Sequence, residues 1–179
     1  MQVVAITGTP GTGKSSVTGE LQMRGFKVLE ISEAVKALGI ASEYSEEYGS
    51  YEVDVEELKK KIDAHVATLN EKRIFLSGHL SHFVSCDFAV VLRCEPHTLY
   101  SRLGSRGWKS EKILENVRAE LLDVILVEAA KRIKDVFEID TTGINPARAS
   151  DLLLQVVESG NDAMRPGNIN WMGEIEEWF

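Results

Sequence analysis

Short apolar runs alternate along the chain with longer stretches in which apolar residues recur every three or four positions. The runs are rich in β-branched and aromatic residues, as expected of buried strands. They predict five strands, at residues 3–6, 26–31, 73–77, 86–92 and 136–139. The stretches between them have helical spacing, which is clearest at Val55, Leu58, Ile62, Val66 and Leu69.

This spacing predicts helices over residues 16–24, 33–38, 54–69, 97–106, 113–135 and 147–158. Strands that alternate with helices predict an α/β fold, with a five-stranded parallel sheet covered by helices on both faces. Residues 42–51 are acidic and tyrosine-rich and predict a solvated loop, and residues 159–170 predict a linker. Beyond them, Trp171, Trp178 and Phe179 predict a tail that docks on an apolar surface.

The composition is typical of one compact domain, which we place at residues 1–179. Of the 179 residues, 44% are hydrophobic and 27% are charged, which is enough apolar material for a sizeable core. The net charge is −8, so the broad basic surface that nucleic-acid binding requires is not expected. A polyphosphate ligand must therefore find its positive charge locally.

The first residues, Met1 to Val4, lead directly into the first predicted strand and leave no space for a signal peptide. No apolar run approaches the length of a membrane span. We therefore expect a cytoplasmic protein without membrane association. The two cysteines, Cys86 and Cys94, lie near a predicted strand and are expected to be reduced and partly buried.

Between the first strand and the first helix lies Gly8-Thr9-Pro10-Gly11-Thr12-Gly13-Lys14-Ser15, a complete phosphate-binding loop of the form G-x-x-x-x-G-K-[ST]. Its glycines allow successive backbone N–H groups to point at phosphate oxygens, and the helix that follows adds partial positive charge. We expect Lys14 to contact the β- and γ-phosphates of ATP, and Ser15 to ligate Mg²⁺. The predicted nucleotide-binding residues of this segment are Gly11, Thr12, Gly13, Lys14, Ser15 and Ser16.

Arg102 and Arg106 lie four residues apart in a predicted helix and therefore on one face. They precede Gly107 and a short polar stretch, residues 108–112, an arrangement typical of a closing lid. Planar guanidinium groups stabilise the charge on a transferred phosphoryl group. Behind a phosphate loop, this pair predicts phosphoryl transfer with Lys14, Arg102 and Arg106 as catalytic residues.

The third predicted strand ends in Ser77-Gly78-His79. Phosphate-loop enzymes commonly have an acidic residue at this point, where it helps to hold Mg²⁺ through water, and Ser77 occupies that position here. His79 follows the strand at the edge where open α/β sheets bind their ligands, so we predict that it contacts phosphate or transfers a proton. His79 and His82 without a third ligand are weak evidence for zinc.

Taken together, four segments resemble the nuclear-type adenylate kinases, a family that includes the coilin-interacting nuclear ATPase and its archaeal homologues. The segments are Gly8 to Ser15, Gly78-His79, Arg102-Leu103-x-x-Arg106-Gly107-Trp108 and Glu115-Asn116-Val117-x-Ala119-Glu120. The phosphate loop alone occurs in many families, whereas the combined set is far more specific. The resemblance covers nearly the whole chain.

The resemblance implies a phosphate-loop fold of the nucleoside monophosphate kinase type, with an NMP-binding module near residues 33–53 and a short lid near residues 104–112. It implies transfer of a phosphoryl group from ATP to AMP or another nucleoside monophosphate, together with a slow ATPase activity. It also implies a part in maturation of the small ribosomal subunit, through binding of a platform ribosomal protein.

By the same correspondence, Arg102 would lie over the adenine and Arg106 would contact phosphates. Thr142 and Gly143 match the loop whose backbone borders the adenine. His79 matches the histidine that follows the third strand in the family and is associated with nucleotide handling.

Two positions depart from the family pattern. Ser77 replaces an acidic residue, which weakens the expected water-mediated contact with Mg²⁺, and Glu33 stands where an aspartate often follows the second strand. Two alternatives therefore stay open beside the adenylate kinase hypothesis. One is an assembly factor that is switched by its nucleotide, with incidental kinase activity, and the other is a kinase of small metabolites.

Overall fold

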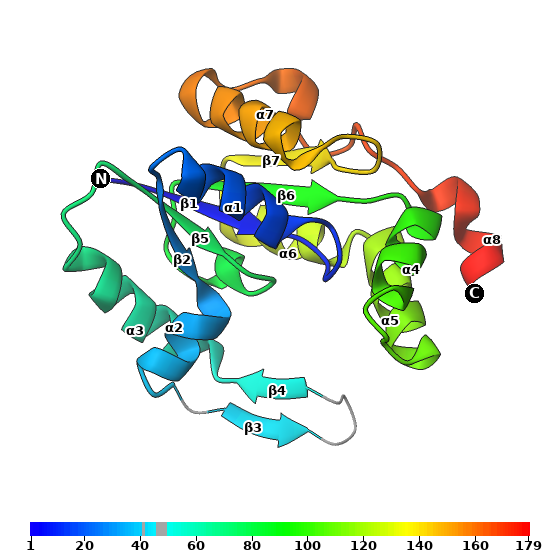
Figure 1. The fold of residues 1–179 in the computed structure, drawn as a ribbon, viewed down its shortest axis with the longest axis horizontal. Coiled ribbons are helices and arrows are strands. Elements are labelled where there is room, and N and C mark those ends of the chain that lie inside the picture. The colour runs from blue at the N-terminus through cyan, green and yellow to red at the C-terminus, as the bar shows by residue number, and fades with distance from the viewer. Residues whose placement is uncertain (41, 46–49) are drawn as a thin grey trace.

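In the computed structural model, the backbone is described for residues 1–40, 42–45 and 50–179, and the side chains for residues 1–40 and 53–179. This part of the chain forms a central five-stranded sheet with helices on both sides, and a separate two-stranded sheet (Figure 1). None of the described helices is long and apolar enough to cross a membrane.

The central sheet is parallel, as the sequence predicts. Its strands are β1 (Gln2–Thr7), β2 (Lys27–Glu30), β5 (Arg73–Ser77), β6 (Phe88–Arg93) and β7 (Val136–Asp140). They lie in the order β2-β5-β1-β6-β7, so that β1 is central. Because all neighbouring strands are parallel, their carboxyl ends lie along one edge, where the loops that follow them meet.

Each face of the sheet is covered by its own helices, because successive residues of a strand point to opposite faces. The helices on one face are α1 (Lys14–Met23) and α7 (Pro146–Ser159), and those on the other are α2 (Ile31–Ala37), α3 (Val55–Ala67) and α6 (Val124–Arg132). Val4 and Ile6 of β1 pack with Leu21 of α1, whereas Val3 and Ala5 pack on the opposite side. The prediction of an α/β fold covered on both faces is confirmed.

The predicted loop at residues 42–51 is wrong. The backbone there forms an antiparallel pair, β3 (Ser42–Ser45) and β4 (Ser50–Val53), which lies apart from the central sheet below α2 (Figure 1). A hairpin satisfies its backbone hydrogen bonds between neighbours in the sequence. It therefore does not require the alternation of apolar residues that marks a strand packed on a core. Residues 41 and 46–49, which belong to the predicted NMP-binding module, lie outside the described residues.

The single helix predicted over residues 113–135 is divided in two. α5 (Ser110–Leu121) ends before Asp123, and α6 begins directly after it. Asp123 has a φ of 54°, a left-handed conformation that aspartate tolerates better than most residues. Its carboxylate accepts a hydrogen bond from Arg93, a contact between distant residues that helical spacing cannot reveal.

The carboxyl-terminal residues run along a pair of helices beyond the carboxyl edge of the sheet (Figure 1). The pair consists of α4 (Pro96–Gly104) and α5, and the tail contains η3 (Met172–Glu174) and α8 (Ile175–Trp178). Trp178 is 9% exposed and packs in one apolar cluster with Leu99 and Val117, against which Trp171 also lies. The prediction of a docking tail is confirmed for both tryptophans, and the apolar surface belongs to the chain itself.

We expect Trp178→Ala to lower the free energy of unfolding by about 3 kcal/mol, a usual cost of truncating a buried aromatic side chain. Phe179→Ala is the matched control, because its ring is 65% exposed and its loss should cost less than about 0.5 kcal/mol. Urea denaturation followed by circular dichroism measures both values. Equal losses in the two variants would contradict the described docking of the tail.

Candidate functional site

The phosphate-binding loop connects the central strand β1 to α1 at the carboxyl edge of the sheet. Gly8 has a φ of 134°, and a Cβ atom there would lie 2.3 Å from the carbonyl oxygen of Leu92. Gly11 has a φ of 95°, and a Cβ atom there would lie 2.7 Å from the side chain of Leu99. Both positions therefore require glycine, and the loop is held in close contact with the start of α4.

Polar contacts fix the inside of the loop. The Thr12 hydroxyl donates to the carbonyl oxygen of Thr9 at 2.9 Å, and the Thr12 carbonyl accepts a hydrogen bond from Thr141 Oγ1 at 2.8 Å. Lys14 Nζ donates to the carbonyl oxygens of Gly8 and Thr9, at 2.6 and 3.0 Å. The ammonium group of Lys14 thus lies folded across the loop, where the phosphates of a nucleotide are expected.

The environment of Lys14 lowers its pKa to about 8. Burial of the ammonium group is the main cause, and the positive charge of Arg106 lowers the pKa further, while the carboxylates of Glu120 and Glu30 raise it. Two cations from distant parts of the chain therefore converge on the loop. A bound polyphosphate would relieve the repulsion between them.

A pocket of about 280 Å³ opens beside the loop. It brings together Gly11, Gly13 and Ser16 from the loop and α1, Arg102 from α4, Arg106 from the turn after α4, and Thr141 and Ile144 after β7. The predicted binding residues Thr142 and Gly143 do not line this pocket. Their neighbour in the chain, Thr141, lines it instead. Thr141 was not predicted, because its Oγ1 contacts the loop only through the folded sheet.

The two arginines differ in their surroundings. The guanidinium group of Arg102, on α4, donates to the carbonyl oxygens of Thr141 and Thr142, at 2.8 and 3.3 Å, and to Thr141 Oγ1 at 3.2 Å. It therefore forms a fixed wall of the pocket. The prediction that Arg106 shares a helical face with Arg102 is wrong, because α4 ends at Gly104; Arg106 lies exposed in the turn that follows and lines the same pocket. The predicted lid at residues 104–112 corresponds to the end of α4, the turn that follows and the start of α5.

His79 lies at the exposed rim of the site. Its pKa is lowered to about 4, first by burial of the ring and then by the positive charges of Lys14, His82 and Lys112. The lowered pKa leaves the imidazole neutral at pH 7. His79 can therefore donate or accept a hydrogen bond, but it adds no positive charge to the phosphate site.

His82 does not form a metal site with His79. Its Nδ1 atom lies 3.0 Å from Thr7 Oγ1, and its Nε2 atom lies 3.2 Å from Glu128 Oε2. Burial lowers the pKa of His82. The ring thus connects β1 with α6 inside the protein.

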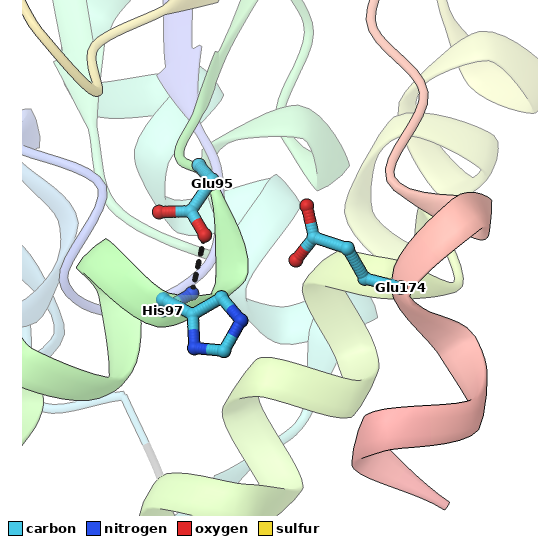
Figure 2. A group of neighbouring side chains, drawn as sticks. All are labelled: Glu95, His97 and Glu174. Atoms are coloured by element: carbon cyan, nitrogen blue, oxygen red, sulfur yellow. Dashed lines mark hydrogen bonds between the residues drawn. The ribbon is translucent and has the colours of Figure 1, made fainter.

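A different group of possible metal ligands lies at the start of α4, away from the phosphate loop. Glu95, His97 and Glu174 have ligand atoms within 4.8 Å of one another (Figure 2). Glu95 already accepts hydrogen bonds from the backbone N–H groups of His97 and Thr98, and His97 Nε2 lies 3.2 Å from Glu177. These groups join the tail to the first turn of α4, and we assign no metal to them.

The phosphate loop is also tied to a buried cluster of charged side chains, which we call the Arg93 cluster. Arg93 donates to Glu120 Oε1 at 2.6 Å, to Glu138 Oε2 at 2.9 Å and to the carboxylate of Asp123. Arg93, Glu120 and Glu138 are each at most 2% exposed. Glu120 Oε2 in turn accepts a hydrogen bond of 2.5 Å from the hydroxyl group of Thr9 in the loop.

A second buried carboxylate of the Arg93 cluster, that of Glu138, binds the segment before the tail. Glu138 Oε1 accepts hydrogen bonds from three successive backbone N–H groups, those of Gly167, Asn168 and Ile169, each at 3.0 Å. Sequence reasoning missed the cluster, although a signal was present. Arg93 ends an apolar strand, Glu120 lies on the apolar face of α5, and Glu138 stands between apolar residues in β7.

The site offers suitable ligands for Mg²⁺. Ser15 lies in the first turn of α1 and is exposed to solvent. The carboxylate of Glu30 contacts the same helix, because it accepts a 3.0 Å hydrogen bond from Thr18 Oγ1. Hydroxyl and carboxylate oxygens, together with nucleotide phosphates, are the ligands that Mg²⁺ prefers. Ser15 would hold the ion directly, and the ion would neutralise charge on the β- and γ-phosphates.

The five-stranded parallel sheet, the phosphate loop after its central strand and the arginine-lined pocket define a phosphate-loop protein of the nucleotide kinase type.

Comparison with known proteins supports this class. The family model described as an AAA domain matches residues 4–123. "Putative adenylate kinase" of Archaeoglobus fulgidus is 41% identical over 178 residues, covering 98% of this chain and 94% of its own. The Methanocaldococcus jannaschii protein of the same name is 41% identical over 177 residues, with the same coverage. The chain therefore belongs to this archaeal adenylate kinase family.

Solved structures agree on the fold. TT1252 from Thermus thermophilus aligns with a TM-score of 0.57 at 16% identity, covering 89% of this chain and 98% of its own. Deoxyadenosine kinase from M. mycoides with bound dATP aligns with a TM-score of 0.54 at 15% identity, covering 88% of this chain and all of its own. At these identities the similarity establishes the fold alone.

We expect Arg93→Met to lower the free energy of unfolding by about 3–5 kcal/mol, because it leaves two buried carboxylates without their cation. Arg24→Met is the control, since Arg24 forms a 2.7 Å ion pair with Asp151 at the surface and should cost less than about 1 kcal/mol. Guanidinium denaturation measures the difference. Similar values for the two variants would show that the Arg93 cluster does not stabilise the fold.

We expect the affinity for ATP to fall as the pH rises through about 8. Lys14 loses its proton near this pH in the free protein, whereas bound phosphate raises its pKa, so binding above pH 8 must take up a proton. Calorimetric titration between pH 7 and pH 9 measures the effect. In Lys14→Arg the guanidinium group stays protonated, and the profile should become flat. A flat profile in the unaltered protein would contradict the lowered pKa.

Proposed function

We propose that this protein transfers the γ-phosphoryl group of ATP to AMP or another nucleoside monophosphate, with Mg²⁺ as cofactor. The observation that carries the proposal is that Arg102 and Arg106 line one pocket beside the phosphate loop, and that the charge of Arg106 also acts on Lys14 of that loop. Charge spreads over the oxygens of the transferred group in phosphoryl transfer, and preorganised cations stabilise it. The archaeal relatives are themselves named as adenylate kinases.

In the proposed reaction, a phosphate oxygen of AMP forms a bond to the γ-phosphorus of ATP while the bond between that phosphorus and the β–γ bridging oxygen breaks, giving two ADP molecules. The nucleophile is already an anion, so no general base is required. The neutral state of His79 fits this chemistry, because the N–H group of a neutral imidazole can donate a hydrogen bond that orients an anionic phosphate oxygen.

The two nucleotides would occupy different parts of the site. Lys14 and the backbone N–H groups of the loop would bind the phosphates of ATP, and the wall formed by Arg102 and Thr141 would face its base. The NMP-binding module near residues 33–53 would receive the acceptor, and the lid near residues 104–112 would bring Arg106 over the phosphates. The turn between α4 and α5 is short and exposed, which favours such a movement.

A second candidate is a nucleotide-switched assembly factor with slow ATPase activity. It is favoured by one observation: the loop residue Thr9 is connected through the Arg93 cluster to residues 167–169, just before the docked tail. The state of the nucleotide could thereby alter the surface of the tail. The partner would be a basic platform protein of the small ribosomal subunit in the cytoplasm, for which a net charge of −8 is complementary.

The kinase proposal is tested by following ADP formation from ATP in the presence and absence of AMP. We expect AMP to accelerate the reaction, and Lys14→Ala to reduce the rate by about 100-fold or more, because it removes a charge that stabilises the transition state. Lys27→Ala, at an exposed position in β2, is the matched control and should retain the full rate.

If AMP leaves the consumption of ATP unchanged, the kinase proposal fails. Binding of the platform ribosomal protein would then be compared in ATP and ADP, and a difference between the two nucleotides would support the assembly factor instead. Undiminished turnover by Lys14→Ala would exclude both candidates, since each depends on the phosphate loop.

A further inference from the structure

The position expected to carry an acidic residue is occupied by Ser77, the last residue of β5, which is 1% exposed. Among the described residues, Ser77 Oγ has no hydrogen-bond partner. Its direct neighbour across the sheet is Glu30, the last residue of β2. Phe75 and Val28, two residues earlier in each strand, pack in the cluster under α1, so Ser77 and Glu30 both face α1.

The carboxylate of Glu30 reaches the first turn of α1. Its Oε1 atom accepts a hydrogen bond of 3.0 Å from Thr18 Oγ1, and Thr18 Oγ1 lies 3.1 and 3.3 Å from the carbonyl oxygens of Lys14 and Ser15. Glu30 also occupies the N-cap position of α2, but its side chain makes no capping hydrogen bond there. The side chain of Glu30 therefore contacts α1, the helix that follows the phosphate loop, although the backbone of Glu30 lies at the start of α2.

The charges around Lys14 single out the same residue. Two carboxylates raise the pKa of Lys14, those of Glu120 and Glu30. Glu120 is fully engaged, because its oxygens accept hydrogen bonds from Arg93, Thr9 and the backbone of Cys94. Glu30 is held by the neutral hydroxyl of Thr18 and is half-buried, which leaves its negative charge available at the site.

We propose that Glu30 replaces the missing acidic residue of β5, and that its carboxylate accepts hydrogen bonds from water molecules of the Mg²⁺ ion held with ATP at Ser15. Mg²⁺ keeps several of its waters in nucleotide sites, so a carboxylate can position the ion without direct contact. Glu30 is thus a positioning residue. The inference rests on the proposed function, because it requires ATP at the phosphate loop.

The test measures the dissociation constant of ATP by calorimetry, once with excess MgCl₂ and once with EDTA. The ratio of the two constants reports the contribution of Mg²⁺ in each protein. We expect Glu30→Gln to reduce this ratio about tenfold, the equivalent of one charge-assisted hydrogen bond. The constant in EDTA should be unchanged or smaller, since a negative charge near the phosphates has been removed. Glutamine keeps the size of the side chain and can still accept from Thr18.

Glu20→Gln removes the same charge from α1, two residues after Thr18, and serves as the matched control that should keep the full ratio. An unchanged ratio in Glu30→Gln, with a normal ratio in the unaltered protein, would overturn the role of Glu30 alone. An equal loss of affinity for ATP in MgCl₂ and in EDTA would also overturn it, because the loss would then not involve the Mg²⁺ ion. An unaltered protein that binds no ATP in either condition would overturn the proposed function as well.

Discussion

One buried cation, Arg93, holds together parts of the chain that are far apart in sequence. It lies at the end of β6 and forms ion pairs with Glu120 on α5 and Glu138 on β7. An isolated charge in such a place would be strongly unfavourable, so each member depends on the others. The two carboxylates use their remaining oxygens to bind the phosphate loop at Thr9 and the backbone of residues 167–169. The position of the loop and that of the tail thus share one electrostatic constraint.

The phosphate site, unlike the Arg93 cluster, has an excess of positive charge. Lys14 and Arg106 repel each other across the loop, and the pKa of Lys14 is lowered as a result of burial and this repulsion. His79 adds no charge, because it is neutral at pH 7. The structure therefore stabilises excess positive charge at the loop through carboxylates behind it, Glu120 on one side and Glu30 on the other. A polyanion that enters the pocket completes a charge arrangement that the fold has already prepared.

The sequence predicted those features that depend on neighbouring residues or on regular spacing. The five strands of the central sheet, the phosphate loop and the placement of Arg102 on a helix are of this kind, whereas Arg106 lies in the turn after that helix. The predictions from the sequence failed where a contact between residues far apart in the chain determines the local structure. Asp123 interrupts a helical pattern because its carboxylate pairs with Arg93, and Thr141 enters the pocket because β7 lies beside β6. Residues 42–45 pair with residues 50–53, but their sequence is mostly polar and lacks the alternation of apolar residues that would have predicted strands.

The three N–H groups that bind Glu138 also bear on how the protein is made. Because synthesis runs from the amino to the carboxyl end, the phosphate loop is made before residues 167–169, the last of the segments in contact with the Arg93 cluster. Until residues 167–169 have been synthesised, the buried carboxylate of Glu138 lacks their three N–H donors. The Arg93 cluster of a growing chain is therefore completed long after the phosphate loop has been made.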